Sequence, residues 1–170
     1  MHPIAEKLQQ VFPDDLLGSK EAFGELTVVV KPDRIVEMLT FLRDDPETAF
    51  NQLSDVTAVD YRERQPRFDV VYHLNALDHH RRMRVTVGIP EEPAEIESVY
   101  SVYRLAGFGE REVFDLFGIR FRHHPDLRRI FLPDDYDGHP LRKDYPTEGK
   151  GWRADMDFIP IGPIPGSGGT

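Results

Sequence analysis

The 170-residue sequence contains no cysteine. Because thiolates are missing, the chain has no disulfide, no cysteine nucleophile and none of the ordinary iron–sulfur ligands. The sequence therefore excludes thiol chemistry and ordinary iron–sulfur ligation in this chain.

Long apolar runs and an excess of basic charge are also missing. No stretch approaches the length of a membrane span, and the amino terminus lacks the basic region and apolar run of a signal peptide. We therefore expect a cytoplasmic compartment, with any membrane association indirect. The net charge of −9 argues against a nucleic-acid partner, because phosphate neutralisation needs clustered basic residues. No phosphate-binding glycine motif is present, so no nucleotide site is expected.

Periodic apolar residues alternate with prolines and glycines through the first 119 residues. They predict, in chain order, a helix between Pro3 and Pro13, a β-hairpin with a strong strand at 26–30, a helix between Pro32 and Pro46, an antiparallel meander of strands at about 52–61, 67–74 and 81–89, and helices at about 96–105 and 109–117. The fold class is α+β. We expect residues 1–119 to form one compact two-layer domain, in which helices cover one side of a mixed or antiparallel sheet.

Residues 120–170 have a different character. They show no hydrophobic period of helical length and contain prolines at positions 125, 133, 140, 146, 160, 163 and 165. Extended or turn conformation is the consistent interpretation. This predicts a long, extended, Pro-rich C-terminal arm. Its apolar content is too high for a solvated linker, so we expect the arm to lie on another protein surface.

One cluster of histidine and aspartate residues, in the predicted arm, is the only group in the sequence that suggests a metal site. Imidazole and carboxylate groups are ligands for zinc or iron, which raises the alternative of a small metal-dependent hydrolase. The members are His123, His124, Asp126, Asp134, Asp135 and His139. Prolines interrupt any regular spacing that would make these side chains converge, so we expect no metal in this chain.

The most informative segment lies around the end of the last predicted helix. Its motifs are Glu110-Arg111-Glu112-Val113-Phe114-Asp115-Leu116-Phe117-Gly118-Ile119, His124-Pro125-Asp126-Leu127-Arg128-Arg129-Ile130, Leu132-Pro133-Asp134-Asp135 and Gly138-His139-Pro140-Leu141-Arg142-Lys143-Asp144-Tyr145-Pro146. This run is similar to the signature of the 30 kDa subunit family of respiratory complex I, NADH:quinone oxidoreductase. Weaker motifs of that family follow the right order from about residue 45. The chain departs from the family at His123, where the family commonly has glycine.

The resemblance implies a cofactor-free structural subunit in the peripheral arm of a proton-pumping complex. Such a subunit docks on the quinone-site subunit of the 49 kDa type and on iron–sulfur subunits, on the cytoplasmic side of the bacterial cell membrane. FMN, iron–sulfur clusters and quinone are then expected in the partner subunits, and no catalytic residue in this chain. Two alternatives stay open besides the hydrolase: the same role in a ferredoxin- or hydrogenase-linked complex, and a free adaptor module.

Charged residues of the motif segment are the expected polar contacts of the subunit interface. Arginine forks bind carboxylates and carbonyls through two hydrogen bonds, and extended backbone offers its polar groups to a partner. The predicted interface residues are Glu110, Arg111, Glu112, Asp115, Arg128, Arg129, Arg142, Lys143 and Asp144.

Overall fold

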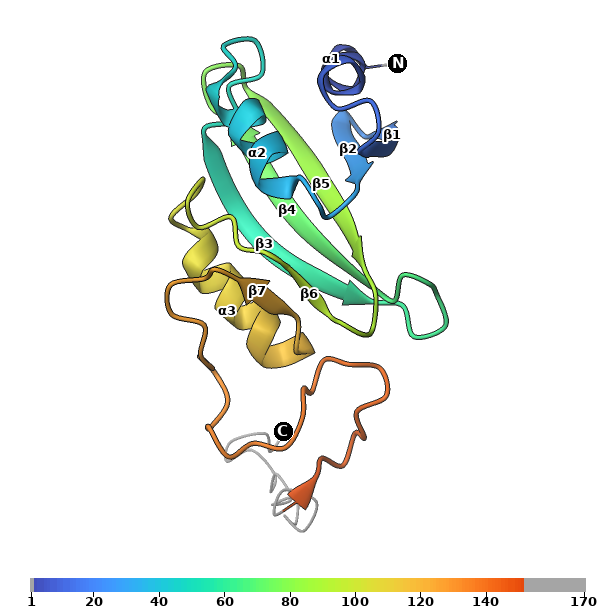
Figure 1. Cartoon of the computed structure of the whole chain (residues 1–170), viewed down its shortest axis with the longest axis vertical. Helices are drawn as coiled ribbons and strands as arrows, with labels where there is room; N and C mark the ends of the chain where they lie inside the picture. Colours follow the sequence, from blue (N-terminus) through green and yellow to red (C-terminus); the bar gives the residue numbers. More distant parts are fainter. Residues whose placement is uncertain (1, 152–170) are drawn as a thin grey trace, which may run out of the picture.

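The computed structural model describes residues 2–151 (Figure 1). In chain order its elements are α1 (Pro3–Val11), β1 (Leu16–Ala22), β2 (Glu25–Val30), α2 (Ile35–Asp44), β3 (Gln52–Asp60), β4 (Phe68–Ala76), β5 (Arg81–Ile89), β6 (Glu95–Glu97), α3 (Ala106–Phe117) and β7 (Arg120–Arg122). The predicted amino-terminal helix, hairpin, second helix and three-stranded meander are all present within one or two residues of their expected limits.

Within the described residues, the main sheet has five strands in the order β1-β2-β5-β4-β3. Strands β2 and β5 pair in parallel, whereas the other neighbours are antiparallel. The parallel pair arises because the chain leaves β2 through α2, forms the meander and returns beside β2 with β5. The sheet is therefore mixed, and the predicted α+β class is confirmed.

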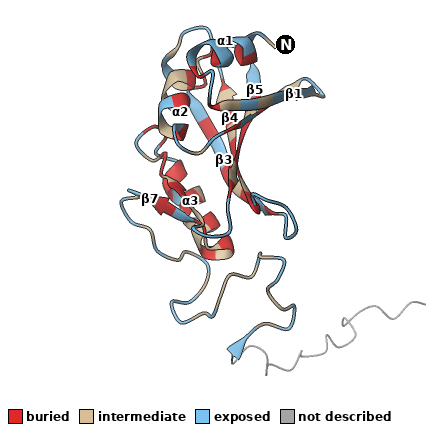
Figure 2. Ribbon diagram, turned by 45° about the vertical axis from the view of Figure 1, so that its right-hand side comes forward, coloured by how far each residue is buried: buried red, intermediate tan, exposed pale blue. Residues whose placement is uncertain are grey.

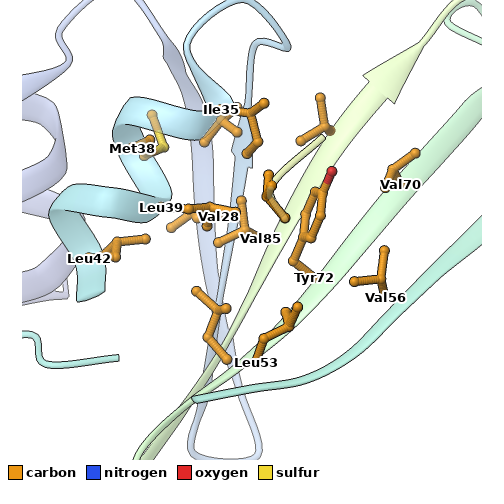
Figure 3. Close-up of a cluster of buried hydrophobic side chains, with 14 of the residues drawn as sticks. Val28, Ile35, Met38, Leu39, Leu42, Leu53, Val56, Val70, Tyr72 and Val85 are labelled. Atoms are coloured by element: carbon orange, nitrogen blue, oxygen red, sulfur yellow. The ribbon is translucent and has the colours of Figure 1, made fainter. Parts of the chain in front are cut away.

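The core lies between α2 and one face of this sheet. Ile35, Met38, Leu39 and Leu42 recur at helical spacing, are fully buried and face the strands (Figure 3). Tyr72 on β4 belongs to the same cluster of buried side chains, together with neighbouring valines of the sheet. Each such side chain stabilises the fold by about 1.5–3 kcal/mol through removal of apolar surface from water. Helix α2 thus supplies one layer of the two-layer domain.

The predicted helix at 96–105 is wrong. Residues 95–97 form β6, which pairs in parallel with β7, and residues 98–105 follow as loop and turns. The apolar spacing of Ile96, Val99 and Val102 resembles a helical face because successive turns also bury every third residue. Glu110, a buried acid on α3, accepts hydrogen bonds from the Ser98 hydroxyl and the Val99 N–H, and these bonds hold the chain in this turn conformation.

Helix α3 lies beside β3 and carries the segment that resembles the family motif (Figure 1). Gly109 allows the close approach, because a Cβ at that position would lie 2.9 Å from the Cβ of Val56. Gly118 ends the helix in the left-handed conformation at φ 75°, as predicted. His123, which stands where the family commonly has glycine, also adopts a positive φ of 60°.

Beyond β7 the chain runs as a long extended segment without helix or strand as far as residue 151, and every residue of 122–151 is half-buried or exposed (Figure 2). The first three residues of the predicted arm, Arg120–Arg122, pair with β6 and are part of the packed body. We use "C-terminal arm" below for residues 123–151. The division of the chain into two domains stays a prediction, and residues 152–170 lie outside the described part.

Candidate functional site

Two acids on α3 are completely buried. Glu110 accepts hydrogen bonds from the Ser98 Oγ at 2.5 Å and from the Val99 N–H at 2.7 Å. Burial raises the pKa of Glu110 to about 7, and these two donors offset only part of that effect. The carboxyl group therefore holds the loop that precedes α3, and its charge changes near neutral pH.

Asp115 is the second buried acid, and it binds the C-terminal arm. Its Oδ2 accepts the N–H groups of Ile130, Phe131 and Leu132 at 3.0, 2.8 and 3.0 Å. Its Oδ1 accepts a hydrogen bond from Arg129 Nη1 at 2.9 Å. Burial acts to raise the pKa of Asp115, but the four donors outweigh it and hold the pKa below the usual range. One carboxylate thus fixes four consecutive residues of the arm.

Two arginines add to this attachment of the arm at Asp115, which we call the first anchor. Arg129 also donates to the carbonyls of Tyr136 and Gly138, at 3.0 and 3.2 Å, and so closes the arm on itself. Arg111 reaches from α3 to the carbonyls of Arg128 and Arg129, both at 3.1 Å. The arm is therefore tied through its backbone as well as through one ion pair.

The last carbonyls of α3 are capped by the arm. The Leu141 N–H donates to Leu116 O at 3.1 Å, and Arg142 Nε donates to Phe117 O at 2.6 Å. His139 Nδ1 lies 2.9 Å from Asp115 O, a geometry that requires a proton on this nitrogen. Burial lowers the pKa of His139, which favours the neutral ring. These bonds satisfy carbonyls that a helix end otherwise leaves unpaired.

A second anchor joins the arm to the sheet. Arg67 at the start of β4 is almost fully buried and pairs with the buried Asp60 at the end of β3, at 2.7 Å. Arg67 also contacts Asp144 of the arm at 2.7 Å, and the Lys143 N–H donates to Asp60 Oδ2 at 2.8 Å. The hydrogen bonds from Arg67 are the main cause that lowers the pKa of Asp60.

Arg67 and Asp60 are not among the predicted interface residues. A signal was present, because Val56, Ala58 and Asp60 are alternate, inward-facing positions of one strand, which places an acid in the apolar series. A buried acid requires a partner, but Arg62, Arg64 and Arg67 all follow within seven residues, so the sequence does not say which cation pairs with Asp60.

The structure brings most of the nine predicted interface residues together at the junction of α3 and the arm. Asp115 pairs with Arg129, and Asp144 pairs with Arg67. Arg128 is exposed and pairs with the exposed Asp126. Within residues 2–151 the side chain of Glu112 has no hydrogen bond or ion pair. The role of the nine residues between subunits stays a prediction, and the geometry adds an internal role for Glu110, Arg111, Asp115, Arg129, Arg142, Lys143 and Asp144.

The histidines of the arm do not form a common site. His123 pairs with Glu97, His124 Nε2 lies 3.0 Å from Gly107 O, and His139 contacts Asp115 O. In the part of the chain that the structure describes, no three His, Asp or Glu side chains are placed to hold a metal ion. The hydrolase alternative therefore finds no geometric support among these residues.

No helix within residues 2–151 combines the length and the apolar character needed to cross a membrane.

Known proteins are similar to this chain over most of its length. The family described as "Respiratory-chain NADH dehydrogenase, 30 Kd subunit" matches residues 28–151. The C-type subunit of NADH-quinone oxidoreductase from Roseiflexus sp. (strain RS-1) is 48% identical over 143 residues, which cover 84% of this chain and 82% of that protein. The same subunit from Geobacter metallireducens is 49% identical over 146 residues, with 85% and 89% coverage.

Two solved structures share the fold. The trypsin-resistant fragment of Nqo5 superposes with a TM-score of 0.61 at 33% identity, and covers 73% of this chain and 98% of its own. A chain of the membrane-bound sulfane sulfur reductase, an archaeal respiratory membrane complex, gives a TM-score of 0.72 at 26% identity, with 85% and 84% coverage.

The matched region contains the whole of β3, β4, β5 and α3, both anchors and the described arm. The family match therefore spans the residues that build the candidate site. From this agreement we conclude that the chain belongs to the 30 kDa subunit family of respiratory-chain NADH dehydrogenase.

Proposed function

We propose that this chain is a cofactor-free structural subunit in the peripheral arm of a proton-pumping NADH:quinone oxidoreductase. It docks on the quinone-site subunit of the 49 kDa type and on iron–sulfur subunits, and it supports their geometry for electron transfer from NADH to quinone. The chain lies at the cytoplasmic side of the bacterial cell membrane and associates with the membrane through these partners.

The absence of cysteine from the sequence supports the cofactor-free part of this proposal. Iron–sulfur clusters are held by cysteine thiolates in most proteins, and this chain offers none. FMN, the iron–sulfur clusters and the quinone are then bound by the partner subunits. The chain supplies protein surface to the complex instead of redox groups.

The observation that carries the proposal is how the C-terminal arm is held. Its backbone and charged groups are bound to the body by Asp115 and by the pair Asp60–Arg67, while Phe131 and Leu141 of the arm are 63% and 48% exposed. Polar groups that bind inward and apolar groups that stay exposed are the arrangement expected of a surface that another protein covers.

Co-purification tests this proposal directly. An affinity tag on the full-length chain should recover the quinone-site and iron–sulfur subunits in equal amounts from membranes, because the chain holds a fixed place in the complex. The isolated chain should show no flavin or iron–sulfur absorbance. Recovery of the chain alone, or with stoichiometric metal, would count against the proposal.

Limited proteolysis gives a second test. The Nqo5 relative is named for a trypsin-resistant fragment, and 98% of that fragment matches this chain. We expect a comparable resistant body here, with trypsin cleavage in the C-terminal arm of the isolated chain and protection of the arm in the complex. Equal cleavage rates in the two states would argue against an arm that partners cover.

A second candidate is the same structural role in a related complex with a ferredoxin- or hydrogenase-type electron input. The similarity to a chain of the archaeal sulfane sulfur reductase, at a TM-score of 0.72, favours keeping it. The electron-input subunits that co-purify with the tagged chain separate the two candidates.

A further inference from the structure

Three large apolar side chains gather around one groove of about 250 Å³. Leu105 and Phe108 come from the start of α3, and Phe131 comes from the C-terminal arm. They are 54%, 65% and 63% exposed. The floor is formed by residues 53–56 of β3, which is one of the two edge strands of the five-stranded sheet in the described part of the chain. Single exposed apolar residues are ordinary on protein surfaces, whereas a contiguous group of them marks an interaction site.

Phe131 is held in this position by a buried charge. The N–H groups of Ile130, Phe131 and Leu132 all bind Asp115 Oδ2, so the backbone that carries the exposed ring is fixed from below. Backbone that is already ordered loses little conformational entropy when a partner covers it. The groove therefore has a preformed wall and does not need to be assembled by binding.

Two carboxylates stand at the same groove. Asp55 and Glu112 line it, both are exposed, and neither side chain makes a hydrogen bond or ion pair within residues 2–151. Most of the remaining lining is apolar and comes from Leu53, Val56, Leu105, Phe108, Ile130 and Phe131. A complementary occupant would therefore place apolar side chains between Leu105, Phe108 and Phe131 and a positive charge beside the two acids.

We propose that this groove receives a segment of a neighbouring polypeptide that carries large apolar residues with a Lys or Arg next to them. The inference rests on the proposed function, because it takes the neighbour to be another subunit of the complex. It adds the place of contact and the chemistry of the segment: apolar anchors at the centre, where interface energy concentrates, and a complementary charge at the rim.

Single-thiol variants test the place of contact. Because the chain has no cysteine, Phe108→Cys introduces one unique thiol in this polypeptide. Leu77→Cys is the matched control, because Leu77 is similarly exposed at 55% but lies in the turn between β4 and β5. Maleimide labelling of this chain is followed by peptide mass spectrometry in the isolated chain and in the complex purified through a tag on the quinone-site subunit. Labelling of Phe108→Cys should slow at least about tenfold in the complex, because the covered thiol reacts only when the interface opens. The Leu77→Cys rate should change little.

Charge reversal tests the chemistry. Glu112→Lys should weaken association with the complex at least about tenfold, because it sets two like charges against each other at the rim. Glu21→Lys, an equal change at an exposed position of β1, is the control and should leave association unchanged. If the cation of the partner is lysine, zero-length carbodiimide should cross-link Asp55 or Glu112 to a lysine of another subunit, and that lysine should have apolar neighbours. If the cation is arginine, no such cross-link should form, but Glu112→Lys should still weaken association.

The outcomes separate this inference from the proposed function. If the tagged complex contains this chain but the Phe108→Cys thiol stays as reactive as in the isolated chain, the groove is not an interface and only this inference fails. If the chain never joins the complex, both fail. Protection that is already present in the isolated full-length chain and disappears in a variant ending at Gly151 would show the chain's own carboxyl-terminal segment in the groove. A cross-link between two copies of this chain would show self-association. Either result overturns the proposal of a second polypeptide.

Discussion

Replacing Asp115 by alanine should detach the C-terminal arm without unfolding the body. The carboxylate is fully buried and is the common acceptor for Arg129 and for the N–H groups of Ile130, Phe131 and Leu132. Alanine removes all four acceptor contacts, because a methyl group accepts no hydrogen bond. It also leaves the Arg129 guanidinium without its counter-charge.

The size of the effect follows from this geometry. Removing one partner of a buried ion pair costs about 3–5 kcal/mol. The Arg129 side chain is 17% exposed and keeps two carbonyl acceptors, so we expect about 3 kcal/mol, at the lower end of that range. The loss of unfolding free energy cannot exceed what docking of the arm contributes, because the substitution has no further effect once the arm is free.

Hydrogen exchange measures this directly. A loss of about 3 kcal/mol corresponds to about a hundredfold faster exchange of the amides at 130–132. Urea unfolding should show a decrease of the same size or smaller. Asp126→Ala is the matched control, because Asp126 pairs with Arg128 at the exposed surface and should change stability by less than about 1 kcal/mol. Unchanged exchange at 130–132 in Asp115→Ala would refute the claim that this carboxylate holds the arm.

Three further changes probe the other contacts. The pKa of Glu110 is about 7 in the folded chain against an ordinary 4.5, so the carboxyl group of the unfolded chain ionises at lower pH. The free energy of unfolding should therefore fall as the pH rises from about 4.5 to 7. Glu110→Gln should remove up to about 3 kcal/mol of that fall. Urea unfolding at pH 5 and pH 8 measures this, and a difference between the two proteins that is the same at both pH values would contradict it. Arg67→Met should destabilise the chain by about 3–5 kcal/mol, because Asp60 is left buried without its counter-charge, and the added change Asp60→Asn should recover part of the loss. A double-mutant cycle with no coupling would exclude the anchor. Gly118→Ala should cost at least about 1–2 kcal/mol for the left-handed conformation, and the new Cβ would lie 2.5 Å from His139, so trypsin should also cleave the arm faster; unchanged cleavage would show that the arm does not rest on this helix end.

The sequence determined the local elements because their signals are local. Period-two alternation in β3, β4 and β5, the apolar face of α2 and the glycine that ends α3 each depend on neighbouring residues alone. The absence of cysteine and the motif at 110–119 likewise need no coordinates, and they led to the same family that the comparisons show.

The predicted helix at 96–105 was wrong because the local signal there is ambiguous. Apolar residues at positions 96, 99 and 102 have helical spacing, yet the chain forms β6 and turns there. Glu110 stabilises this turn conformation: it lies 11 residues from Val99 in the sequence and accepts a hydrogen bond from the Val99 N–H. A strand of three residues with a parallel partner some 25 residues away leaves no pattern that a sequence window detects.

Tertiary structure alone decided what the charged motif residues do. A run such as Glu110, Arg111 and Glu112 has the same appearance whether its side chains are solvated, buried or bound to a neighbour. The chain path places one of the three in the core, one on the backbone of the arm and one, without a partner among residues 2–151, at the groove. In the same way the buried Asp60 meets Lys143, which is 83 residues away. Such pairings depend on how the elements pack, because a buried charge is stable only where the fold brings hydrogen-bond donors to it. A local sequence pattern therefore cannot predict which residues pair.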